Sequence, residues 1–106
     1  MKKYTLSIGL RDGKIPGHPQ IIPAFIAKSI IANTMLDRFG GATIIDAIGV
    51  YTHDNGRKVR EKTLVVYIYD AEESAVKSAC EYLARRLRQE SIAYECADFT
   101  SEFIRP

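Results

Sequence analysis

The sequence predicts a single α+β domain, residues 1–106, whose elements follow the order β-α-β-β-α-β. Three patterns predict it. Residues 3–10 alternate large apolar with small or polar side chains, as a half-buried strand does. Residues 42–52 and 58–69 are two strand-like runs joined by a segment that contains Asn-Gly, a strong hairpin signal. Apolar side chains also recur at helical spacing at Val76, Ala79, Cys80, Leu83 and Leu87.

The first helix is predicted over residues 21–39. Pro23 is tolerated in a first helical turn, and Gly40-Gly41 is a natural C-terminal stop. One side of this helix carries Ile22, Ile26, Ser29, Asn33 and Leu36, and further apolar residues widen its apolar surface. The preceding residues 11–20 hold two Gly and two Pro and are predicted to be a loop.

The second helix is predicted to run to about Arg88. Asp70 and Glu73 stand three residues apart before it, which predicts a capping box. Glu73 and Lys77 are spaced for an ion pair on the exposed side of the helix. Residues 91–97 complete the order as the last strand.

Two crossovers around a hairpin give a four-stranded antiparallel sheet with both helices on one face, the ferredoxin-like arrangement. In this topology the first strand ends at the same edge as the hairpin and the start of the last strand. Residues 11–20, 53–57 and 89–91 are therefore expected to gather at one end of the domain.

Composition excludes several classes of protein. The chain has 106 residues, a net charge of +2 and only two cysteines, so neither a dedicated nucleic-acid binder nor a disulfide-rich scaffold is expected. Two His and two Cys at wide spacing make no metal ligand set, and no cofactor motif is present. No run of residues is long and apolar enough for a membrane span, and no signal region precedes the first strand, so we expect a cytoplasmic protein.

The gathered end is the best candidate for a binding site. Loops rich in Gly that lead into a helix N-terminus attract anions, and basic side chains surround this one. The alternative is a solvated end with scattered charges, which is common. The candidate ligand-binding residues here are Arg11, Lys14, His18, His53 and Arg57.

Two further groups are expected near the same end. Glu61 would share a sheet face with Tyr67 and could bond a ribose hydroxyl, act as a base, or pair with a neighbouring cation. The polar triplet Gln89, Glu90 and Ser91 joins the last helix to the last strand. It would either contact a ligand or only cap the helix and turn the chain. No complete catalytic constellation is visible.

The sheet face without helices is predicted to be flat and partly apolar, with Val65, Tyr67 and Tyr69 in its middle. Such a patch marks an interaction surface, and packing two sheets together would hide it. We therefore expect a homo-oligomer, a dimer or higher.

Two stretches resemble a family of small, largely uncharacterised ferredoxin-like proteins from bacteria, phages and mobile elements. They are GATIIDAIGVYTHDNGRKVREKTLVV, residues 41–66, and RQESIAYE, residues 88–95. The resemblance implies a compact, self-associating α+β protein that acts on host processes.

Three functions remain open on this basis. The sequence favours a non-catalytic protein that sequesters an anionic, nucleotide-like signal of host defence. The second is an inhibitor or oligomerisation module that docks on a host enzyme. The third is a small enzyme on the same fold, with Glu61 or His53 as its base.

Overall fold

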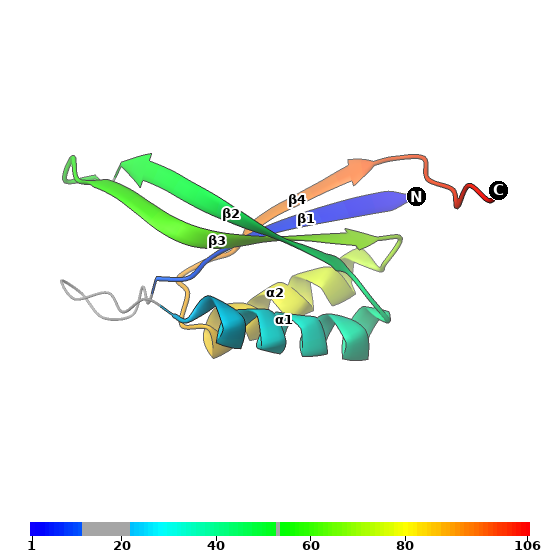
Figure 1. Cartoon of the computed structure of the whole chain (residues 1–106), viewed down its shortest axis with the longest axis horizontal. Coiled ribbons are helices and arrows are strands. Elements are labelled where there is room, and N and C mark those ends of the chain that lie inside the picture. Colours follow the sequence, from blue (N-terminus) through cyan, green and yellow to red (C-terminus); the bar gives the residue numbers. More distant parts are fainter. Residues whose placement is uncertain (12–21, 53) are drawn as a thin grey trace.

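The computed structural model describes residues 1–11, 22–52 and 54–106. The elements follow the predicted order along the chain (Figure 1). They are β1 (Lys2–Gly9), α1 (Ala24–Phe39), β2 (Thr43–Thr52), β3 (Lys58–Tyr69), α2 (Glu73–Arg86) and β4 (Ala93–Asp98). The prediction of a βαββαβ fold is confirmed.

The four strands form one antiparallel sheet in the order β2-β3-β1-β4. β1 is central: Leu6 pairs with Val66 of β3 on one side and with Tyr94 of β4 on the other. Both helices lie on the same face of this sheet, and the hairpin of β2 and β3 reaches beyond their ends (Figure 1). This is the predicted ferredoxin-like arrangement.

The core lies between the sheet and the two helices. Alternate side chains of β1 and β3 face the helices because successive strand residues point to opposite faces. Burying each large aliphatic side chain contributes about 1.5–3 kcal/mol. The buried cluster includes Tyr4, Leu6 and Ile8 from β1, Leu64, Val66 and Ile68 from β3, Ala27, Ile31 and Met35 from α1, and Val76, Ala79 and Leu83 from α2.

α1 begins at Ala24, after Pro23, and ends at a left-handed Gly40 with φ of 78°. The side of α1 that packs on the sheet is not the side with Ile26 and Leu36 that the sequence analysis described. Ala27, Ile31 and Met35 are buried, whereas Ile26 and Leu36 are 43% and 60% exposed. Two apolar stripes compete on this helix, and the smaller Ala27 allows the closer approach to the sheet.

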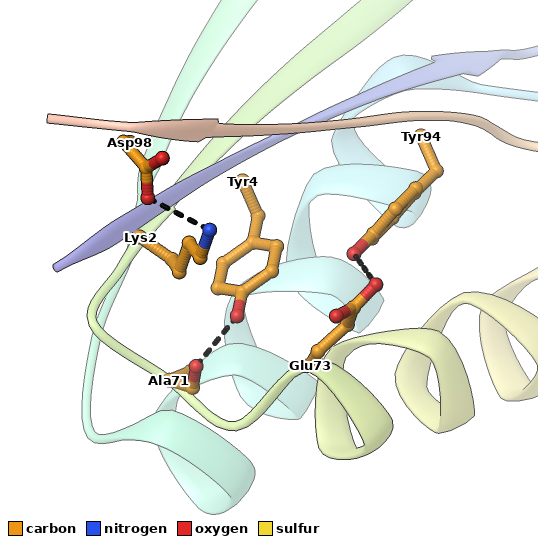
Figure 2. A network of polar contacts seen from close by, with 6 residues as sticks. All are labelled: Lys2, Tyr4, Ala71, Glu73, Tyr94 and Asp98. Carbon is orange, nitrogen blue, oxygen red and sulfur yellow. Dashed lines mark hydrogen bonds and ion pairs between the residues drawn. The ribbon is translucent and has the colours of Figure 1, made fainter.

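The predicted capping box is wrong. Asp70 has φ of 57° and lies outside the helix, and Glu72 occupies the N-cap without a side-chain hydrogen bond. The Glu73 carboxylate instead accepts a bond from the Tyr94 hydroxyl at 3.2 Å and pairs with Lys77 at 3.1 Å. Asp70 therefore does not cap the helix, and the Glu73 side chain contacts Tyr94 of β4 (Figure 2).

Neither helix in the part of the chain described here has the length and apolar character needed to cross a membrane.

Candidate functional site

Glu61 lies between two glycines on the helix-free face of the sheet. Gly49 is its partner in the β2–β3 register, and Gly9 lies diagonally across on β1. A methyl group added at Gly9 would overlap the Glu61 carboxylate, 2.9 Å from Oε2. At Gly49 it would meet the Thr63 hydroxyl at 2.7 Å, and the Glu61 Cγ only at 3.6 Å. The missing side chain at Gly9 therefore leaves room for the Glu61 carboxylate to lie against the strands.

The end of β1 approaches the same carboxylate. The backbone N–H of Arg11 donates to Glu61 Oε2 at 3.3 Å. The chain is held there by its neighbour, because the N–H of Leu10 donates to the carbonyl of Lys62 at 3.0 Å. Within the described residues Glu61 makes no ion pair with Arg60 or Lys62. Its carboxylate is therefore held by a backbone amide and keeps acceptor capacity for a ligand.

Gln89 connects this corner to the end of α2. It is one of two polar residues that are buried among those described, at 9% exposure. Its side-chain amide donates to the carbonyl of Arg11 at 2.5 Å and to that of Leu87 at 3.2 Å. The turn that precedes it includes Arg88 with φ of 56°. Two segments far apart in sequence are thereby fixed against each other.

A hollow of about 430 Å³ opens beside this corner. Its size falls in the range of small-molecule sites. The hollow combines an apolar part with three cationic side chains and one carboxylate. Its lining residues are Leu10, Arg11, Ile48, Arg60, Glu61 and Lys62. Such a surface suits a ligand that has both an apolar body and charged ends.

The Arg11 guanidinium has one donor without an acceptor. Its Nε is shielded from solvent and has no hydrogen-bond partner among the residues described. A buried donor left in this state costs about 1–3 kcal/mol.

No protein-family model and no curated protein sequence matches this chain. Solved structures share its fold, among them two of phage proteins. A phage SAM lyase in complex with S-methyl-5'-thioadenosine has a TM-score of 0.66 and 20% identity, over 92% of this chain and 80% of that chain. A phage SAM lyase in its apo state has a TM-score of 0.56 and 20% identity, over 98% of this chain and 92% of that chain.

The structure brings together three of the predicted binding residues, Arg11, Glu61 and Gln89. Glu90 and Ser91 are exposed in the turn after α2. Arg57 lies at the hairpin tip, where its N–H donates to Asn55 Oδ1 at 2.9 Å. No contact among the described residues joins Arg57 to the corner. The candidates Lys14, His18 and His53 fall outside the described residues.

The sequence analysis missed the two glycines and part of the lining. Gly9 and Gly49 lie inside strands, where Gly weakens the strand and often marks a close approach of another group. That signal was available in the sequence. Ile48, Arg60 and Lys62 gave no comparable signal, because exposed side chains on a hairpin are ordinary.

The three residues of the predicted partner face share the helix-free side of the sheet. Val65 and Tyr67 are half-buried and Tyr69 is exposed, all on the side of β3 opposite the core. The Lys3 ammonium lies 4.2 Å from the centre of the Tyr67 ring, and Tyr69 packs on Phe99 at 5.3 Å. These contacts cover part of the patch from within the chain.

A second polar cluster lies toward the opposite end of β1 (Figure 2). The buried Tyr4 hydroxyl donates to the carbonyl of Ala71 at 2.7 Å, and Lys2 pairs with Asp98 at 2.7 Å. Burial, and then the Glu73 carboxylate, raise the pKa of Tyr94. The described residues contain no His, Cys, Asp and Glu group suited to a metal ion. This cluster joins β4, β1 and α2, and none of its residues lines the hollow beside Glu61.

Proposed function

We propose that this chain is a lyase that cleaves S-adenosylmethionine at the hollow beside Glu61. The observation that carries the proposal is Glu61, which lines the hollow and whose carboxylate, laid over Gly9, pairs with no cation of the described residues. The likeness to two phage SAM lyases supports it, as one of them is bound to S-methyl-5'-thioadenosine.

The ligand's chemistry matches the lining. S-adenosylmethionine has a positively charged sulfonium, an ammonium and a carboxylate around an apolar thioether skeleton. Glu61 supplies a negative group for the cationic part, while Leu10 and Ile48 supply apolar contact. Charge-assisted contacts of this kind are about twice as strong as neutral hydrogen bonds.

The cleavage needs no metal and no water. When the bond between sulfur and the amino-acid fragment breaks, its electron pair stays on sulfur, which becomes the neutral thioether of S-methyl-5'-thioadenosine. The carbon left behind is captured by the fragment's own carboxylate oxygen, which closes a lactone. Atoms and charge balance without a proton transfer, and the enzyme's part is to hold the two reacting groups in line.

This chemistry changes the role of Glu61 from the one that the sequence suggested. A base is not required for ring closure. A carboxylate beside the sulfonium stabilises the positively charged ground state, and that charge fades as the bond breaks. Glu61 should therefore govern affinity for S-adenosylmethionine more than the rate of the chemical step.

The test is incubation of the purified chain with S-adenosylmethionine, with S-methyl-5'-thioadenosine measured by chromatography and mass spectrometry. We expect release of S-methyl-5'-thioadenosine and a KM raised about tenfold or more in Glu61→Gln. Glu102→Gln, in the exposed C-terminal tail, is the matched control and should behave as the wild type.

Two other outcomes are informative. Tight binding of S-adenosylmethionine without any product would overturn the lyase and restore the sequestering protein that the sequence favoured. If the chain neither binds nor turns over S-adenosylmethionine, the proposed site is rejected. Docking on a protein partner is then the favoured function. A lyase would fit the anti-defence role that the resemblance implies, since it removes the methyl donor used in host methylation.

A further inference from the structure

We propose that Arg11 forms a carboxylate-binding subsite in the hollow, which recognises the amino-acid end of the ligand. The inference rests on the proposed function and adds to it the group that distinguishes substrate from product. It assigns to Arg11 a specificity role that the fold likeness does not supply.

The backbone of Arg11 is fixed on both sides. Its N–H donates to the Glu61 carboxylate at 3.3 Å, and its carbonyl accepts from the buried Gln89 amide at 2.5 Å. The residue before it is tied to β3 through Leu10 and Lys62. The start of the Arg11 side chain is thus held by three separate elements, β1, β3 and the turn after α2.

The Arg11 guanidinium has one unused donor, its Nε, among the described residues, in spite of this rigid backbone. Among the described residues it makes no ion pair, and its Nε is enclosed without an acceptor. The nearby Glu61 carboxylate uses the Arg11 backbone N–H. Because Arg11 lines the hollow, the terminal nitrogens of the same guanidinium are the donors that a ligand there would meet.

A carboxylate is the group that fits. The planar guanidinium presents paired donors that match the two oxygens of a carboxylate. Arg60 and Lys62 line the same hollow and add positive potential, and Leu10 and Ile48 add apolar surface.

The subsite also serves the proposed reaction. Arg11 can hold one carboxylate oxygen while the other is left to approach the carbon beside sulfur. S-methyl-5'-thioadenosine has no carboxylate, and a lactone has no free one. Both products therefore lose the Arg11 contact as they form, which favours their release.

The test uses two unreactive ligands that differ only in the carboxylate. S-adenosylhomocysteine has it, and its decarboxylated analogue S-adenosyl-3-thiopropylamine lacks it. Neither has a sulfonium, so equilibrium affinities are measurable by calorimetry. We expect the wild type to prefer S-adenosylhomocysteine about tenfold or more, and Arg11→Met to bind the two alike. Arg11→Lys keeps the positive charge but loses the paired donors of the guanidinium, so it should retain part of the preference for S-adenosylhomocysteine.

Arg105→Met removes one positive charge from the exposed tail and is the matched control, in which the preference should be unchanged. A thermal melt of each variant verifies that it folds. An undiminished preference in Arg11→Met, or none in the wild type, would overturn the subsite while turnover of S-adenosylmethionine leaves the lyase standing. Failure of the wild type both to bind these two ligands and to turn over S-adenosylmethionine would overturn both proposals.

Discussion

The side-chain amide of Gln89 donates to the backbone carbonyl of Arg11 over 2.5 Å, although 78 positions separate the two residues. This bond ties the turn after α2 to the end of β1. Arg11 in turn donates its N–H to Glu61. Gln89 is thus two hydrogen bonds away from the carboxylate and is suited to position it from within the core.

Gln89→Met tests that connection, because Met keeps the length of the side chain and removes the donors. Two carbonyls, those of Arg11 and Leu87, then lose a hydrogen bond in a buried place. We expect the free energy of unfolding to fall by about 1–3 kcal/mol, measured by urea denaturation. Affinity for S-adenosylmethionine should fall as well, because the Arg11 peptide is no longer fixed.

Ser91→Ala is the control for this change, two residues further on and exposed. Its stability should lie within about 0.5 kcal/mol of the wild type. If Gln89→Met were equally harmless, the bond to Arg11 would be of no structural consequence.

Gly9→Ala should separate the site from the fold. The added methyl meets the Glu61 carboxylate, which is the end of a flexible side chain and can move aside. Stability should change by less than about 1 kcal/mol, while the KM for S-adenosylmethionine rises about tenfold because the carboxylate is displaced. Steady-state kinetics and a thermal melt measure the two effects. Gly41→Ala, which meets nothing within 4 Å, is the control; equal kinetics in both variants would contradict the role of Gly9.

Glu73 predicts a pH dependence of stability. The bond from Lys77, and then that from Tyr94, lower the pKa of Glu73 below its usual 4.5. The stabilisation is therefore complete above that value and is lost as the pH falls through the lower folded value. Wild type and Glu73→Gln should differ in unfolding midpoint at pH 7 and converge in acid. A difference in unfolding midpoint that persists in acid would contradict this. Glu81→Gln, on the exposed side of α2, is the control and should show no such pH-dependent difference from the wild type.

The partner face on β3 predicts self-association. Tyr69 is 48% exposed beside the half-buried Val65 and Tyr67. A patch of this kind is hidden when two copies meet. We expect a dimer or larger species by light scattering, and a smaller species for Tyr69→Lys. Tyr82→Lys, on α2, is the control; a monomeric wild type would reject the prediction.

Several elements could be predicted because their signals are local. β3 spans Lys58–Tyr69 as expected, since its alternation and the Asn-Gly turn before it lie within a few residues. The same holds for the order of the elements and hence for the ferredoxin-like sheet. The capping box failed although it too is local, because the turn out of β3 left Asp70 in a conformation that cannot cap.

The sequence by itself determined the fold class and pointed to Arg11, Glu61 and Gln89 as polar residues near one end. Only the tertiary structure decided that Gly9 makes room for Glu61, that the Arg11 Nε has no partner among the described residues, and that α1 turns Ala27 and not Ile26 to the core. The physical reason is the distance along the sequence over which each kind of interaction acts. Periodicity and turn chemistry act over a few neighbours, whereas these contacts join residues that strand pairing and helix packing bring together across the chain.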